Sequence, residues 1–111
     1  MNGLNKVTLT GNLGKDPETK TIDEKLVVTK FTMATTESYK DEKGEKHSVT
    51  EWHNIVLWNK QAALAAKYLK KGSKIYLEGK IKTRSYENKE GQKKQVTEII
   101  ADHFLMLDKP E

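Results

Sequence analysis

The amino-acid sequence predicts a small all-β domain, in which five strands close into a barrel and one α-helix lies between the third and fourth strands. Two observations lead to this prediction. Five segments alternate apolar and polar residues as strands do, and only one segment changes to a helical period. Hydrophobic residues make up only 35% of the 111 residues and 32% are charged, so the core must be small, and a closed sheet is an economical way to build it.

The first strand is predicted over Val7–Leu13, where apolar residues alternate with threonine and asparagine. This alternation is typical of a strand with one buried face. The glycines of the GNLG segment (residues 11–14) indicate a sharp bend or a bulge, as a small barrel requires. The Asp16-Pro17 pair then ends the strand pairing, and the polar segment Thr19–Lys25 is interpreted as a loop.

The second strand is predicted over Leu26–Thr36, a segment rich in the β-branched residues that favour strands. Alternation places Val27, Phe31 and Met33 on one face. The charged segment Tyr39–Ser48, with a glycine at its centre, predicts a long hairpin loop between this strand and the next one.

The third strand, predicted over Glu51–Trp58, carries the most informative pattern in the chain. Alternation divides the strand into two faces. One face carries Trp52, Asn54, Val56 and Trp58, and the other carries His53, Ile55 and Leu57. Two interpretations are open at this point. Either the strand is buried on both faces, or the tryptophans form an exposed aromatic surface opposite a core face.

The helix is predicted over residues 60–71, directly after the third strand. Asn59 is interpreted as its N-cap and Gly72 as the residue that ends it, because these residue types are favoured at the two helix ends. Spacings of four residues predict one apolar stripe. The stripe consists of Leu64, Ala65, Tyr68 and Leu69.

The fourth strand is predicted over Lys74–Tyr86 and the fifth over Gln95–Leu107, with the charged hairpin loop Glu87–Lys93 between them. Alternation places the basic residues of the fourth strand on one face together with a tyrosine. These residues are Lys80, Lys82, Arg84 and Tyr86. The order of three strands, one helix and two strands is that of the OB-fold, a five-stranded barrel.

The charge distribution favours a polyanionic partner. The net charge is +4, but the segment 60–94 holds eleven Lys and Arg residues against three Asp and Glu residues. Single-stranded nucleic acids need aromatic rings for their bases and cations for their phosphates. The candidate aromatic residues are Trp52, Trp58, Tyr39 and Tyr86. The candidate basic residues are Lys60, Lys71, Lys80, Lys82 and Arg84.

Several other classes of protein are not expected. The absence of cysteine excludes disulfides and thiolate metal sites. The spacing of His47, His53 and His103 matches no metal motif, so neither a metal nor another cofactor is expected. No phosphate-binding glycine-rich loop or paired carboxylates stand out, so catalytic residues, and therefore an enzyme, are not expected. No apolar run is long enough for a membrane span, and no signal peptide is recognisable.

Four segments, in the same order along the chain, resemble the bacterial single-stranded DNA-binding protein family. They are NKVTLTGNLGKDPE, TEWHNIVLW, YLKKGSKIYLEGKIKTRSY and TEIIADHFLML. The resemblance covers nearly the whole chain. It implies an OB-fold, a homotetramer, and sequence-independent binding of single-stranded DNA during replication, recombination and repair.

The resemblance also implies roles for individual residues. Trp52 and Trp58 match positions where the family stacks bases, although the second is more often phenylalanine. Tyr39 and Tyr86 fall where many members have tryptophan, so the stacking surface is smaller here. The remaining DNA-binding positions expected from the family and from the basic strand are Lys20, Lys60, Lys71, Lys82, Arg84 and Asn54. His53 matches a subunit-interface position, and Tyr76 is also expected at the subunit interface.

Residues 1–107 are expected to form the OB-fold DNA-binding domain, and residues 108–111 a short polar end. Family members usually continue into a flexible linker and an acidic tail that recruits replication and repair proteins. Such partners are therefore expected only if a tail exists outside this chain. The expected location is the bacterial cytoplasm, at the nucleoid.

Three alternatives stay open on the sequence alone. A primosomal restart protein shares the fold but is typically a dimer, and the TEW motif argues against it. An RNA-binding OB module uses similar aromatic residues. A purely structural oligomerisation domain would place Trp52 and Trp58 at subunit contacts.

Overall fold

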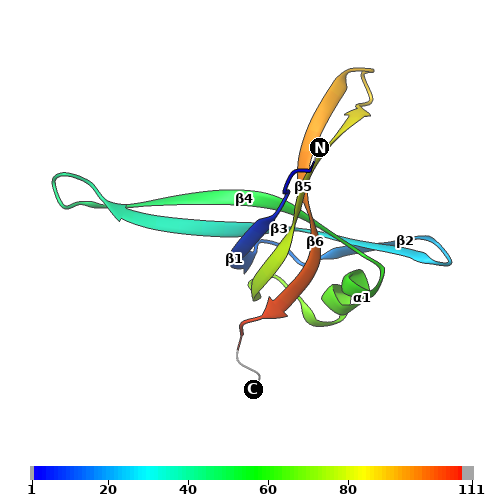
Figure 1. Ribbon diagram of the computed structural model, residues 1–111, viewed down its shortest axis with the longest axis horizontal. Coiled ribbons are helices and arrows are strands. Elements are labelled where there is room, and N and C mark those ends of the chain that lie inside the picture. The colour runs from blue at the N-terminus through cyan, green and yellow to red at the C-terminus, as the bar shows by residue number, and fades with distance from the viewer. Residues whose placement is uncertain (1, 109–111) are drawn as a thin grey trace.

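A computed structural model describes residues 2–108 as six strands and one helix (Figure 1). In chain order they are β1 (Val7–Leu13), β2 (Glu18–Asp23), β3 (Leu26–Lys40), β4 (Lys46–Trp58), α1 (Asn59–Tyr68), β5 (Lys74–Glu87) and β6 (Lys93–Met106). None of the helices in the described part of the chain is long and apolar enough to cross a membrane.

Five of the strands close into a barrel. The sheet order is β1-β5-β6-β4-β3-β2, and β1 also pairs with β3, which joins the two sides of the sheet. At this seam Asn12 lies opposite Ala34 and Leu13 opposite Met33. All pairs are antiparallel except β4 with β6. The predicted OB-fold barrel is therefore confirmed, with its helix between the third and fourth barrel strands, here β4 and β5.

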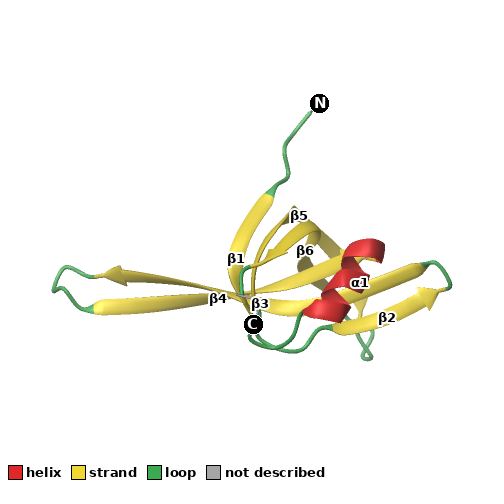
Figure 2. Ribbon diagram, turned by 90° about the horizontal axis from the view of Figure 1, so that it is seen from below, coloured by secondary structure: helices red, strands yellow, loops and turns green. Residues whose placement is uncertain are grey.

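The barrel core is formed by the inward-facing residues of β3, β4 and β5. Met33, Leu57, Ile75 and Leu77 are completely buried and Ile55 nearly so. The predicted core face of the second strand, with Phe31 also buried, is thus confirmed. The helix α1 packs beside β3 and β4 (Figure 2).

Two long hairpins project from the barrel in different directions, one formed by β3 and β4 and the other by β5 and β6 (Figure 1). Their strands extend further than predicted, so that the loops shrink to residues 41–45 and 88–92. The continuous cross-strand register, from Val28 opposite Trp58 to Lys40 opposite Lys46, accounts for this extension. Strand pairing thus continues into segments whose high charge predicted a loop.

The interpretation of Thr19–Lys25 as a loop was wrong. Residues 18–23 form β2, which pairs with β3 in antiparallel register. Every residue of β2 is exposed, because the strand lies at the sheet edge, outside the barrel. A strand with no buried face has no apolar alternation, which is the signal that sequence analysis uses.

The helix ends three residues earlier than predicted. Leu69 has extended dihedrals, and it is buried in the core. The following amides bond elsewhere: Gly72 N–H donates to the Leu13 carbonyl over 2.9 Å, and Ser73 N–H to the Lys70 carbonyl over 3.0 Å. Gly72 has a φ of 89°, but it lies in this turn and not directly after the helix.

The predicted N-cap was also wrong, and the apolar stripe was right only for Ala65 and Leu69. Asn59 does not cap the helix; it adopts a left-handed φ of 53°, which asparagine tolerates, and its Oδ1 accepts the Val27 N–H. Leu64 and Tyr68 are exposed. The buried side consists of Ala65 and Leu69 together with Ala62, which was not predicted. Small residues allow close packing there, and Thr29 Oγ1 donates to the Ala62 carbonyl over 2.9 Å.

Candidate nucleic-acid interface

The outer face of β4 carries both tryptophans. Trp52 is 60% exposed and Trp58 is 40% exposed, whereas Ile55 and Leu57 on the opposite face are buried. Val56 lies between the two tryptophans on the same face and is buried, but neither indole is, so in the isolated chain this face carries an exposed aromatic surface. Exposed indole rings on a rigid, centrally placed strand are suitable for stacking with planar ligands.

The indole of Trp52 lies directly over Gly14. A Cβ atom added to Gly14 would stand 2.4 Å from Trp52 Cζ3 and 3.2 Å from Thr32 Oγ1. The Gly14 N–H donates to the Thr32 carbonyl over 3.0 Å, which fixes this glycine beside β3. Only glycine leaves room for the ring, so Gly14 determines where the exposed face of Trp52 points.

Cations flank Trp58 on both sides. On one side, Lys20 of β2 lies opposite Val28 of β3, which in turn lies opposite Trp58. On the other side, Trp58 and Lys80 line an open depression together with Gln61, Ile100, Ala101 and Asp102. This places one aromatic ring between two exposed ammonium groups on the outer surface of the barrel.

Asn54, between the two tryptophans, lines a second depression of about 180 Å³. The other residues that line it are Lys15, Asp16, Glu18, Lys30, Phe31, Thr32 and Ile55. Asp16 Oδ1 accepts the backbone N–H of Lys71 over 2.8 Å, so Lys71 is anchored beside this depression. Lys60 lies exposed near the start of α1, two residues after Trp58.

The outer face of β5 carries the predicted basic row. Lys80, Lys82, Arg84 and Tyr86 share this face and are exposed, as predicted, but the residues between them are exposed as well, because this part of β5 lies in the projecting hairpin. Arg84 is also paired: its Nε donates to Glu98 Oε1 over 2.9 Å, and its Nη2 to Glu98 Oε2 over 3.5 Å. This pairing raises the pKa of Arg84. The guanidinium carbon lies 5.8 Å from the centroid of the Tyr86 ring, within cation–π range.

Tyr39 lies near the tip of the β3–β4 hairpin, in a segment that was predicted as loop but belongs to β3. It is 54% exposed. Strand alternation puts it on the inward-facing side of β3, with Phe31 and Met33, and so on the side opposite the tryptophans. Its ring stacks on His47, with centroids 5.3 Å apart. Tyr39 is thus separate from the tryptophan surface.

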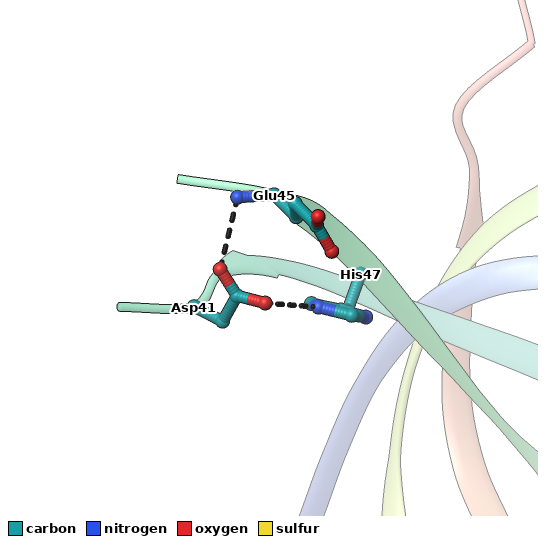
Figure 3. Close-up of side chains that lie close together, drawn as sticks. All are labelled: Asp41, Glu45 and His47. Atoms are coloured by element: carbon teal, nitrogen blue, oxygen red, sulfur yellow. Dashed lines mark hydrogen bonds and ion pairs between the residues drawn. The ribbon is translucent and has the colours of Figure 1, made fainter. Parts of the chain in front are cut away.

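Asp41, Glu45 and His47 gather at this hairpin tip (Figure 3). Asp41 Oδ1 accepts the backbone N–H groups of Lys43 and Glu45, and Asp41 Oδ2 bonds His47 Nε2 over 2.8 Å. The bond to His47, followed by those to the backbone, lowers the pKa of Asp41. The three side chains have the ligand types of a metal site. Both carboxylate oxygens of Asp41 already have hydrogen-bond partners, however, since Oδ1 accepts two amides of the turn and Oδ2 bonds His47.

The two residues expected at a subunit interface lie on different faces. His53 is half-buried on the inward-facing side of β4 and bonds Thr35 Oγ1 over 2.9 Å. Tyr76 lies on the outer face of β5 and donates its hydroxyl to Glu78 over 2.5 Å. That bond raises the pKa of Tyr76, and with the nearby charge of Lys6 it lowers the pKa of Glu78.

The structure thus assembles most of the predicted residues into one outer surface on β2, β4 and β5. Sequence reasoning missed two residues that shape it. Gly14 was noted only as a sign of strand bending, and nothing in the sequence pairs it with Trp52. Glu98 is only 7% exposed, whereas a glutamate in an alternating strand is expected to be solvated. Its partner Arg84 is its diagonal neighbour and not the residue directly opposite on β5, so the spacing along the chain does not indicate the pair.

Comparisons with known proteins agree with this architecture. The model of the single-strand binding protein family matches residues 4–107. A curated relative, single-stranded DNA-binding protein 1 of Chlorobaculum tepidum, is 48% identical over 106 residues, which cover 95% of this chain. The match spans 65% of that relative's length.

Two solved structures are similar in fold. One is the Plasmodium falciparum SSB in complex with ssDNA, with a TM-score of 0.89, 35% identity, and coverage of 97% of this chain and 98% of that one. The other is a deletion mutant of the single-stranded DNA binding protein from Thermus aquaticus, with a TM-score of 0.82 and 29% identity over 96% of this chain and 51% of that one. On the match of residues 4–107, the chain belongs to the single-strand binding protein family.

Proposed function

We propose that this chain binds single-stranded DNA without sequence specificity and protects it during replication, recombination and repair. The observation that carries the proposal is the pair of exposed indoles, Trp52 and Trp58, on the outer face of a strand whose other face is core. Family membership and the similarity to an SSB in complex with ssDNA support it. The chain acts by binding and is not an enzyme.

In this proposal bases stack on the aromatic rings while cations neutralise phosphates. The rings are Trp52 and Trp58 on the barrel, with Tyr86 and Tyr39 on the two hairpins. The phosphate contacts are Lys20, Lys60, Lys71 and Lys82, and Asn54 contacts a base or sugar from its depression. Stacking is sequence-tolerant because every base has a π-face. Residues 1–107 form the binding domain.

Affinity measurements on tryptophan variants test the proposal. Stacking of one base on an aromatic ring contributes about 1–3 kcal/mol, and about 1.4 kcal/mol corresponds to a factor of ten. Trp52→Ala and Trp58→Ala should therefore each weaken oligo-dT binding roughly 10- to 100-fold at fixed salt. The urea midpoint should change little, because the core face is intact.

The outcomes are distinguishable. A loss of about 3–5 kcal/mol of stability without a specific loss of binding would show that the tryptophans serve packing. Parallel titration with oligo-rU identifies an RNA-binding module, which would bind oligo-rU more tightly than oligo-dT.

We further propose that the chain assembles as a homotetramer in the bacterial cytoplasm, at the nucleoid. Exposed apolar side chains at the end of β6 support self-association, since Leu105, Met106 and Leu107 are each more than 40% exposed. His53 and Tyr76 are the proposed interface residues. Light scattering that gives a monomer mass at all concentrations would refute this assembly. Replication and repair proteins are proposed as partners only of a chain that carries an acidic tail.

A further inference from the structure

A buried carboxylate lies within the basic row of the outer face. Glu98 on β6 is 7% exposed. Its cross-strand neighbour on β5 is Lys82, yet both carboxylate oxygens contact the guanidinium of Arg84, two residues further along that strand. Lys80 precedes these cations on the same face, and Lys94 lies opposite Tyr86. Glu98 therefore pairs with the arginine and not with a neighbouring lysine, because only a guanidinium presents two N–H donors in a fixed planar geometry.

The guanidinium of Arg84 is held from two directions. Glu98 bonds two of its nitrogens, and the ring of Tyr86, 45% exposed, lies 5.8 Å from its central carbon. Arg84 and Tyr86 are two residues apart on one strand face, so the contact follows from strand geometry. The ion pair thus fixes the side chain that lies against Tyr86.

The pairing also removes a charge from the surface. A phosphate attracted to Arg84 meets a guanidinium whose charge is balanced by a carboxylate in direct contact. Among residues 2–108, only two ion pairs occur, and neither includes Lys80 or Lys82. Those two lysines keep their charge for a polyanion, whereas Arg84 does not. Strand alternation alone does not distinguish Arg84 from the two lysines, because all three lie on one face.

We propose that Glu98 is a positioning residue of the nucleic-acid site: it holds the Arg84 guanidinium against Tyr86, so that the two form one stacking surface for a base, and it withholds the Arg84 charge from the phosphates. The inference rests on the proposed function. It changes the role of Arg84 from a phosphate contact to a support of an aromatic ring.

The salt dependence of oligo-dT binding tests this proposal. Each phosphate neutralised on a single strand contributes about 0.7 to the slope of log affinity against log salt. Glu98→Gln keeps the shape of the side chain but removes its charge, so it frees Arg84 for a phosphate. The slope should steepen by about 0.7, and affinity at low salt should rise.

Two further variants serve as controls. In Arg84→Gln/Glu98→Gln the pair is again neutral, so the slope should return to the wild-type value. Glu90→Gln removes an exposed carboxylate at the tip of the same hairpin, which makes no ion pair with Arg84. The salt slope of oligo-dT binding should stay unchanged, because salt screens the exposed Glu90 charge from the phosphates. A structural role of Glu98 alone would alter the urea midpoint but not these slopes.

If Glu98→Gln fails to fold, the oligo-dT affinity of Arg84→Lys tests the proposal, and an affinity equal to that of the wild type would overturn it. This variant keeps the charge but loses the fork and the planar contact with Tyr86, so affinity should fall several-fold with no change of slope. An unchanged slope in folded Glu98→Gln, or a double variant flatter than wild type by about 0.7, would overturn the proposal. Absence of saturable binding by the wild type would instead refute the proposed function on which it rests.

Discussion

At the scale of single residues, the placement of Trp52 depends on a glycine that contacts no ligand in the proposed site. Gly14 lies outside the left-handed region, since the glycines with positive φ among the described residues are Gly44, Gly72 and Gly91. Alanine is therefore tolerated by the backbone at position 14. The atoms nearest to its added Cβ would be the far end of the indole and a threonine hydroxyl.

Gly14→Ala should weaken DNA binding without unfolding the protein. The methyl group displaces the Trp52 ring, and the stability cost is small because the ring is exposed and can move. Oligo-dT affinity should fall by up to about tenfold, within the range of one lost base stack. The loss should vanish in a Trp52→Ala background. Gly3→Ala, where nothing lies within 4 Å, is the matched control. A loss that persists without Trp52 would contradict this reading of Gly14.

The residue scale also shows what alternation can and cannot predict. Period-two spacing was sufficient to assign Trp52 and Trp58 to one face and Ile55 to the other, because β4 runs without a bulge through this segment. It could not predict that Glu98 is buried or that Gly14 supports an indole. Both depend on residues of other strands, far along the chain, and only the closed barrel brings these together.

At the scale of elements, the two hairpins share one tip geometry. Asp41 and Asn88 each accept two backbone N–H groups of their own turn through Oδ1. Gly44 and Gly91 occupy the left-handed position, with φ values of 81° and 79°. A left-handed position in a hairpin turn favours glycine, which has no Cβ to clash there. The difference between the tips is chemical, since one side chain titrates and the other does not.

The Asp41 tip should therefore loosen in acid, whereas the Asn88 tip should not. The pKa of Asp41 is depressed below its ordinary 3.8 by His47 and the backbone. Its stabilising contribution is thus complete above about pH 4 and is lost as the pH falls through the lowered pKa. Backbone ¹⁵N relaxation should show Lys43 and Glu45 becoming mobile below pH 3.8, with Glu90 and Gln92 unaffected. Equal loosening of both tips would contradict the assignment to Asp41.

Element boundaries were predictable only where burial is one-sided. The core faces of β3, β4 and β5 matched the expectation, because each alternates against a single core. The edge strand β2 was missed since it has no buried face. The end of α1 was misplaced because the amides of residues 70–73 are committed to the Leu13 carbonyl, the Asp16 carboxylate and the turn itself. These partners are distant in sequence.

At the scale of the whole molecule, closure of the barrel requires a close approach at Gly11. A Cβ at this position would lie 2.1 Å from the Ala34 carbonyl oxygen and 3.0 Å from its carbon. Both atoms belong to the backbone of β3 at the seam with β1. Unlike the Trp52 ring over Gly14, this backbone cannot move aside without opening the seam.

Gly11→Ala should accordingly lower stability, whereas Gly14→Ala lowers affinity. Overpacking of this kind costs about 1–3 kcal/mol, occasionally more, and the urea midpoint should fall by a corresponding amount. In the fraction that folds, oligo-dT affinity should stay near wild type, because Trp52 and Trp58 are untouched. An unchanged midpoint would mean that the seam is looser than the structure describes.

The central claim is that the outer surface carrying Trp52 and Trp58 is where single-stranded DNA binds. The most direct measurement is a titration with labelled oligo-dT at low salt, in which the anisotropy of the label and the tryptophan emission of the protein are recorded together. The chain contains only these two tryptophans. The emission should be quenched and should saturate at the same oligonucleotide concentration as the anisotropy. Saturating anisotropy with unchanged tryptophan emission would place the DNA elsewhere on the molecule and contradict the account.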